Sequence, residues 1–385
     1  MRRCAIFAAA LGVVVCGPGA LSQVTLRGGE VLDDLVIEAT GQGLRTEPRL
    51  GSGSTRLLPW DMVRAVPDDK TEMLAPYAAL AESSWRARWR VLRGDHGAAE
   101  PVLAELFSKL SAEDGPLTLR VAEGLTRCRL ARGDQAGAVE PWLAALRLTG
   151  ADAGLPVDPE AARAGRILAA LIDSETGLCP MLPPFWPNAD RTAELARSLV
   201  SVGASGGAQN AGEAELRRWF ARAAALDARA ESLPEAGSSD AGSGGKGAAF
   251  VATLVKARDP DASARRAARD RLLNELSADP DTWKEAWRRF ALGRSYLMES
   301  SADDRAEGVV HMLHLPARFS AVQPYLSGLA AVEAAVELRS MDGPSRTAAE
   351  QIVADLTQRE PFHPALRVLN AAPAGRPAGT QEGGR

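Results

Sequence analysis

The chain has 385 residues, 46% of them hydrophobic and 24% charged, which is enough for two or three domains with a sizeable core. Its formal net charge of -4 is close to balance, which excludes a strong electrostatic attraction to nucleic acid or to an anionic membrane surface. With only four histidines, the chain offers little material for histidine-based acid–base chemistry.

Residues 1–22 have the pattern of a secretory signal peptide. Two arginines precede an apolar run that is too short to span a bilayer, and small residues at 20–22 lead to a cleavage site before Gln23. This pattern predicts export to the periplasm or to the extracellular space. A lipoprotein anchored through Cys16 is the alternative, although the valines before this cysteine do not suit such processing. No other stretch predicts a transmembrane helix.

Residues 23–66 are predicted to form a small antiparallel β-module. Short β-prone runs separated by turn signals occur at 24–26, 31–38, 44–46 and 57–66. A module of this size is marginal alone, so we expect it to lean on the next domain. The pattern, which ends in LLPWDMVRAV, resembles the small SH3-like or Sm-like β-modules that open many exported bacterial proteins.

From residue 67 onward the chain is predicted to be helical, and one phrase occurs twice. RGDHGAAEPVLAELF (93–107) and RGDQAGAVEPWLAAL (132–146) share a Gly-Asp turn followed by apolar residues at the spacing of an amphipathic helix. Each phrase follows another helical stretch, so the repeated unit is helix, tight turn, helix, with a period of 39–40 residues. Such a unit buries its apolar stripe only by stacking on its neighbours. The glycine of each turn is expected to end the first helix, and the aspartate to cap the second.

The G-D-x-x-x-A pattern after a helix that bears Trp89 and Leu92 resembles a tetratricopeptide repeat (TPR). Leu292-Gly293 and Tyr296 match the L-G-x-x-Y arrangement of the same family. The unit is longer than the family's usual length and its first copies lack the tyrosine and proline landmarks, so the resemblance is to a divergent member. It implies an array of helical hairpins whose surface recognises a partner.

The sequence therefore predicts a mostly α protein, a TPR-like array of helical hairpins preceded by the small antiparallel β-module. Asp-Pro pairs at 158–159, 259–260 and 279–280 are predicted to mark helix starts. The predicted organisation is a signal peptide (1–22), the β-module (23–66), a helical-repeat region with two clear hairpins (67–200), a flexible Gly/Ser-rich region with one helix (201–247), a C-terminal helical-repeat region (248–370) and a disordered tail (371–385).

One proline-dense stretch, LPPFWP at 182–187, cannot be helical. We expect it to form either an ordered lid over the helical array or an exposed aromatic hook, and the lid is the favoured interpretation. Two glycine-rich matches to catalytic motifs are attributed to chance. The G-x-S-x-G at 203–207 and the G-x-G-x-x-G at 242–247 both lack the preceding strand that their chemistry requires.

The best candidate metal ligands are Glu307, His311 and His314, which share one face of a predicted helix. The favoured alternative is that both histidines pack at a hairpin interface while Glu307 is solvated, because no fourth ligand is visible. Export would place Cys128 and Cys179 in an oxidising compartment, where they form either one disulfide or two buried thiols. No cofactor is predicted.

A stripe of basic and aromatic residues is the candidate partner-binding surface. Trp85, Arg86, Trp89, Arg90 and Arg93 recur at helical spacing and would suit an anion or an acidic peptide. The favoured alternative is a solvated basic face beside a buried one. We expect a non-catalytic exported scaffold or adaptor that binds a protein or peptide. A metal-dependent envelope hydrolase that uses the three candidate ligands and a purely structural envelope component are the alternatives.

Overall fold

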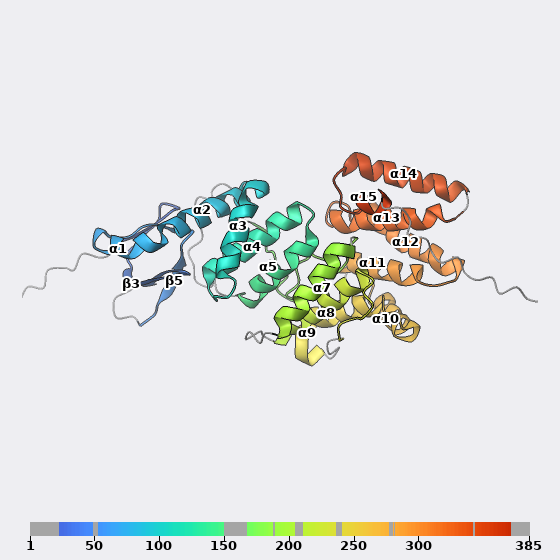
Figure 1. The fold of residues 1–385 in the computed structure, drawn as a ribbon, viewed down its shortest axis with the longest axis horizontal. Coiled ribbons are helices and arrows are strands. Elements are labelled where there is room, and N and C mark those ends of the chain that lie inside the picture. Colours follow the sequence, from blue (N-terminus) through green and yellow to red (C-terminus); the bar gives the residue numbers. More distant parts are fainter. Residues whose placement is uncertain are drawn as a thin grey trace, which may run out of the picture. The chain divides into compact units, whose positions relative to one another are not determined.

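The computed structural model describes residues 23–48, 53–149, 168–187, 189–204, 211–235, 241–276, 280, 282–341 and 343–370 (Figure 1). The predicted signal peptide and tail lie outside these residues, as do positions 205–207 of the G-x-S-x-G match and the Asp-Pro pair at 158–159. The chain divides into two compact units. Unit 1 is residues 1–85 with 152–166, and unit 2 is residues 86–151 with 167–385.

Unit 1 contains the predicted β-module as two three-stranded antiparallel sheets, with strand orders β2-β1-β6 and β3-β4-β5. The run predicted at 31–38 is divided between the sheets because buried Asp34 leaves the ladder and binds Thr46 and Arg56. The run at 57–66 is divided by a turn at 60–62, where Trp60 is buried and stacks on Tyr77. The strands are β1 Val24–Leu26, β2 Val31–Leu32, β3 Leu35–Thr40, β4 Gly43–Glu47, β5 Arg56–Pro59 and β6 Val63–Ala65.

After two 3-10 turns, Asp68–Lys70 and Ala75–Tyr77, with the short α1 Thr71–Leu74 between them, the described chain is helical except for residues 168–187 and the turns. Within the described ranges, none of the helices is both long enough and apolar enough to cross a bilayer. The helices are α2 Ala78–Leu92, α3 His96–Leu110, α4 Pro116–Ala131, α5 Gln135–Arg147, α7 Ala189–Ala204, α8 Ala211–Asp227, α9 Ala241–Lys256, α10 Ala262–Glu275, α11 Trp283–Leu297, α12 Ala302–Arg318, α13 Pro324–Arg339, α14 Gly343–Arg359 and α15 Leu366–Asn370.

The doubled phrase forms two equivalent tight turns, each connecting a pair of helices, as predicted. Gly94 and Gly133 take φ values of +78° and +75°, a region that glycine enters without the penalty of a side chain. The side chain of Asp95 accepts from the Ala98 amide at the start of α3, and Asp134 caps α5 in the same way. Successive helices pack on one another, with α4 between α3 and α5. The prediction of a mostly helical hairpin array behind a small antiparallel β-module is confirmed.

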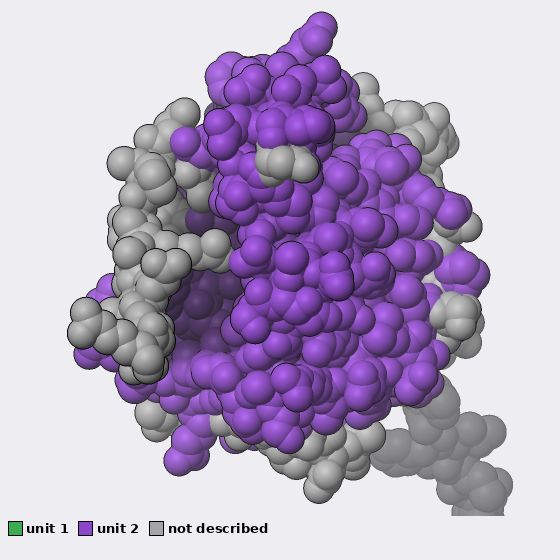
Figure 2. Space-filling view, turned by 90° about the vertical axis from the view of Figure 1, so that its right-hand side faces the viewer, with its two compact units in different colours: residues 1–85, 152–166 green, residues 86–151, 167–385 purple. Residues whose placement is uncertain are grey.

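A large apolar core runs through unit 2 from α5 onward, and a separate small cluster lies between α4 and α5. The large core extends from α5 through the tryptophans of α8 and α11 to Ala365 near the end of the described chain. Trp283 and Trp287 of α11 meet edge to face at 4.8 Å inside it, as expected for core packing. The space-filling view shows that a hollow opens in the surface of unit 2 on the side turned toward the viewer (Figure 2).

Three helix starts differ from the sequence prediction. Helix α10 is capped by Asp261 instead of Asp259, because Asp259 is engaged with Arg222 and with the Asp261 amide. Helix α11 is capped by Thr282. Helix α9 begins at Ala241, inside the stretch predicted to be flexible, and resumes after a break at Gly245.

The glycine-rich start of α9 has a packing reason. A Cβ at Gly247 would lie 2.0 Å from the carbonyl oxygen of Thr176, so only glycine lets α9 approach residues 176–178. Lys246 pairs with Glu175 at 3.0 Å beside this contact. The last glycine of the match to a dinucleotide-binding motif is therefore explained by a close backbone approach within the chain.

We expect Gly247→Ala to lower the free energy of unfolding by about 1–3 kcal/mol, because the new methyl group overlaps backbone that cannot move freely. Gly97→Ala in α3 is the matched control. Open space surrounds its Cβ position, so alanine's helix preference should stabilise the protein by up to about 1 kcal/mol. Urea denaturation of both variants measures the difference, and equal stabilities would contradict the close contact.

Candidate functional site

Residues 178–187, which we call the strap, run between the helices of unit 2 and are enclosed by them. The strap contains no helix or strand, yet five of its side chains are almost completely buried. These side chains belong to Leu178, Cys179, Leu182, Phe185 and Trp186. The LPPFWP stretch is therefore ordered and internal. It contributes aromatic side chains to the core, so the alternative of an exposed hook is wrong.

Side chains from the surrounding helices bind the backbone of the strap. The amide of Gln323, which precedes α13, donates to the carbonyl oxygen of Pro180 at 2.9 Å. An irregular segment has few hydrogen bonds of its own, so such contacts supply partners for backbone groups that are buried. Four more contacts follow along the strap: Arg258 donates to Pro184 (3.0 Å), the Tyr325 hydroxyl to Phe185 (2.8 Å) and Arg294 to Trp186 (3.3 Å), and Asp227 accepts from the Trp186 amide (2.9 Å).

A buried charge network lies beneath the end of the strap. One carboxylate oxygen of Asp227 is 2.6 Å from both Arg258 and Arg294, and Arg294 also binds Glu333. Burial lowers the pKa of Arg258 to about 10, although Asp227 opposes the shift. Burial acts against the charge of Arg294 too, but Asp227 and Glu333 together raise its pKa above the usual value. Both arginines are therefore charged, and the two carboxylates balance them.

Aromatic rings also pack against the strap, in addition to the hydrogen bonds and the charge network. Phe185 packs on Phe290 of α11 with ring centroids 4.6 Å apart, and the guanidinium of Arg258 lies 4.8 Å from the Phe185 ring. Burial raises the pKa of Tyr325 well above its usual value, so its hydroxyl stays protonated and can donate to the strap. The faces that α8, α9, α11 and α13 turn toward one another are thus already filled by the chain itself.

In the described part of unit 2, two grooves border the loop at residues 229–235. The loop leaves α8 through Arg229, which has a φ of 52°, and Arg222 holds it by donating to the carbonyl oxygen of Pro234 at 2.9 Å. Each groove encloses about 780 Å³, which is within the usual size of a ligand site. We call them the α7–α8 groove and the α11–α13 groove.

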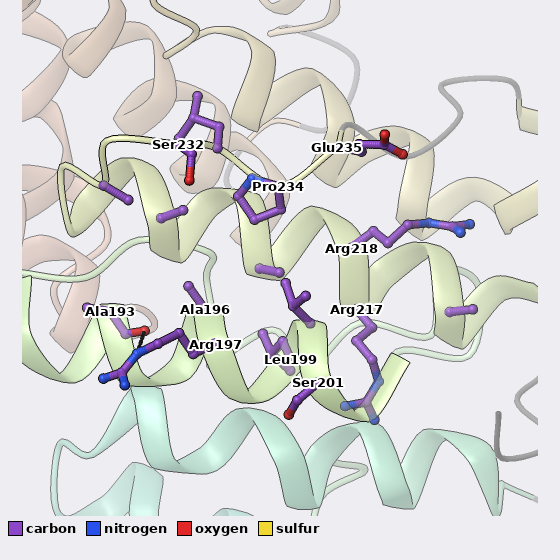
Figure 3. Close-up of a pocket in the computed structure, with 16 residues that line it drawn as sticks. Ala193, Ala196, Arg197, Leu199, Ser201, Arg217, Arg218, Ser232, Pro234 and Glu235 are labelled. Atoms are coloured by element: carbon purple, nitrogen blue, oxygen red, sulfur yellow. Dashed lines mark hydrogen bonds between the residues drawn. The ribbon is translucent and has the colours of Figure 1, made fainter. Parts of the chain in front are cut away.

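The α7–α8 groove has a floor of small apolar side chains. Figure 3 shows Leu199 near its centre, the loop with Ser232 and Pro234 along one side, and Arg197 and Arg218 toward opposite ends. Its charges are largely satisfied within the protein, since Arg218 pairs with Glu215. The apolar lining includes Ala193, Ala196, Leu199, Val200, Ala214 and Ala221.

The α11–α13 groove has more charged residues in its lining than the α7–α8 groove. It also adjoins the last residues of the strap. Trp186 and Pro187 line it, and so do Asp227, Arg294 and Glu333 of the buried network. Apolar side chains from three helices line the remainder: Leu226, Leu297, Met298, Leu329, Val332 and Val336.

The predicted basic and aromatic stripe lies on α2 and the turn after it, and part of it has an internal role. Arg90 donates to the Ala98 carbonyl oxygen, and Arg129 makes the equivalent bond to Gly137 in the second copy of the phrase. Trp85 is covered by the guanidinium of Arg27 at 4.5 Å. Arg86 and Arg93 are exposed, and Trp89 is half-buried. Arg90 therefore joins the two helices of its hairpin, as its counterpart does.

The three candidate metal ligands lie on α12 but do not converge. His311 is buried, lies 3.6 Å from Glu307 and stacks on Tyr296 of α11 with ring centroids 5.7 Å apart. His314 turns instead toward Glu285 of α11, at 3.7 Å. In the part of the chain that the structure describes, no group of three or more His, Cys, Asp or Glu side chains is arranged to hold a metal ion.

We expect the stability of the protein to fall in mild acid because of His311. Burial, with Arg289 and His314 nearby, lowers the pKa of its imidazole from 6.5 to about 4, while the half-exposed Glu307 is screened by water. The folded state therefore disfavours the protonated form. The contribution is fully present above pH 6.5 and is lost as the pH falls toward 4, by about 3 kcal/mol in total. Unfolding free energies of wild type and His311→Phe across this range test it, and parallel profiles would contradict it.

The described cysteines are buried free thiols. Burial raises the pKa of Cys128 to about 12 and that of Cys179 to about 11, so neither is a reactive thiolate near neutral pH. Of the two alternatives stated from the sequence, the structure has the buried thiols.

The chain matches no protein-family model, no curated protein and no solved structure. The geometry of the strap and of the two grooves therefore carries the functional argument. Sequence reasoning did not find Asp227, Arg258, Arg294, Tyr325 or Glu333. Their only signal was the proline- and tryptophan-rich stretch that they hold.

Proposed function

We propose that this protein is an exported, non-catalytic scaffold or adaptor, built as a divergent TPR-like array, that binds a protein or peptide through the grooves of unit 2. The observation that carries the proposal is the pair of open, mainly apolar grooves beside the loop at 229–235. Apolar surface of this kind marks sites where another molecule is bound.

The strap supports the choice of a polypeptide as the bound molecule. The same array already binds ten residues of irregular chain, with side chains that recognise backbone carbonyl and amide groups. Recognition of this type suits a peptide whatever its sequence. Because the strap fills the space between α8, α9, α11 and α13, the partner binds at the remaining grooves and not along the whole array.

Affinity capture from an envelope extract tests the proposal, with variants matched in chemistry. Val336→Glu places a charge in the α11–α13 groove and Val200→Glu places one in the α7–α8 groove, where these valines are 49% and 50% exposed. Val310→Glu on α12 is the control, because Val310 is 61% exposed and lines neither groove.

We expect a specific protein to be retained by wild type and by Val310→Glu, and to be lost from at least one of the groove variants. Retention that none of the substitutions changes, or no specific retention, would refute binding through the grooves.

A further inference from the structure

The α11–α13 groove is the continuation of the space that holds the strap. Trp186 and Pro187 of the strap are among its lining residues, and so are Asp227 and Arg294, which bind the strap. On α13 the groove runs from Leu329 to Glu337, beyond Tyr325, which binds the strap. Eight residue steps of helix span about 12 Å, the length of about three to four residues of extended chain.

Two apolar side chains in this groove lack the cover that their neighbours have. Met298, just after α11, is 47% exposed and Val336 on α13 is 49% exposed, whereas Leu329 and Val332 beside them are buried. They come from different helices and line the same groove, so a single short segment would cover both.

The charges of the groove favour an uncharged occupant. Asp227 binds Arg258 and Arg294, and Arg294 also binds Glu333. The loop adds one charge of each sign, Arg229 and Glu231, and Glu337 of α13, which also lines the groove, is balanced by its ion pair with Arg305. A bound segment with a net charge would therefore find no opposite charge in excess.

Hydrogen-bonding groups in the groove match those that hold the strap. Asp227 accepts the backbone amide of Trp186 while it is bonded to arginine. Glu333 has the same arginine partner, and its side chain is partly exposed in the groove. It offers the next acceptor along α13 for a backbone N–H of a segment that lies end to end with the strap.

We propose that the α11–α13 groove binds a short, uncharged, apolar and non-helical segment of a partner polypeptide as a continuation of the strap. Met298 and Val336 contact its side chains, and Glu333 accepts a hydrogen bond from its backbone. This inference rests on the proposed function, because it names the class of partner and the groove that takes it.

Selection from a random peptide library displayed on phage, with the full protein immobilised, tests the inference. Selected peptides are then synthesised, and their binding is measured by fluorescence anisotropy. We expect them to share a core of about three to four uncharged apolar residues. We expect binding to Val336→Glu and to Met298→Glu to be at least about tenfold weaker than binding to wild type, with no change for Val310→Glu or Val200→Glu.

Circular dichroism and urea denaturation check that each variant is folded, and Met298→Ser replaces any glutamate variant that is not. Charged or helical selected peptides, insensitivity to the Met298 and Val336 substitutions, or a library that yields no binder would each overturn the inference. If extract capture still retains a protein through the α7–α8 groove, the proposed function stands without it. If capture also fails, both are refuted.

Discussion

Phe185→Ala is expected to lower the free energy of unfolding of unit 2 by about 3–5 kcal/mol, the range for removing a fully buried phenylalanine ring. Phe185 is completely buried in the strap, packs on Phe290 and is flanked by the guanidinium groups of Arg258 and Arg294. Alanine would leave a cavity where the strap meets α11. Urea denaturation followed by tryptophan fluorescence measures the loss, because Trp186 is the adjacent residue.

Phe362→Ala is the matched control for this experiment. Phe362 also lies in a proline-flanked turn, but its side chain is 94% exposed. Its truncation should leave the unfolding midpoint unchanged. If both variants were destabilised equally, or neither were, the strap would not be part of the core of unit 2.

Asp227→Asn is expected to cost about 3–5 kcal/mol of stability, because it removes the charge that two buried arginines share. The carboxylate of Asp227 binds Arg258 and Arg294 at 2.6 Å and accepts the backbone amide of Trp186. Asparagine has nearly the same shape, so the packing is preserved while the network changes from balanced to a net positive charge. Glu333 still binds Arg294, but Arg258 loses its ion pair with Asp227.

Asp355→Asn on α14 provides the comparison for the buried network. Asp355 also pairs with an arginine, Arg359, but both side chains are at least half exposed and the pair is screened by water. Its loss should not shift the unfolding midpoint measurably. An Asp227→Asn variant as stable as Asp355→Asn would show that the network is solvated in solution and does not hold the strap.

Local features of the fold were predictable because neighbours in the sequence determine them. The Gly-Asp turns needed only a glycine with positive φ and an aspartate that caps the next helix, and both copies have this geometry. The β-module was predicted as four runs. Its division into six strands depends on the pairing of Asp34 with Arg56 and on the turn at 60–62, where Trp60 is buried against Tyr77, and no local pattern reveals either contact.

The candidate site was not predictable, because its parts are distant in the sequence. Gln323 and Pro180, for instance, are separated by 143 positions, and each buried arginine of the network resembles any other helical arginine in the sequence. The composition of the strap indicated that it was unusual, and the favoured lid interpretation was correct in that the segment is ordered but wrong in placing it over the array, because its side chains are buried in the core. Its position inside the array followed only from which helices surround it.

The strap also changes how unit 2 is expected to fold and unfold. In a linear solenoid each repeat contacts only the adjacent ones, so stability is a sum of nearest-neighbour terms and end repeats fray independently. Here one segment connects α8, α9, α11 and α13, and Pro364 lies against Gly133 of the second repeat turn. These long-range ties make unfolding cooperative across the unit and slow its folding, since distant loops must close before the contacts form. In a chain truncated before α13, we therefore expect the whole of unit 2 to be unfolded, and not merely its last hairpin to be missing.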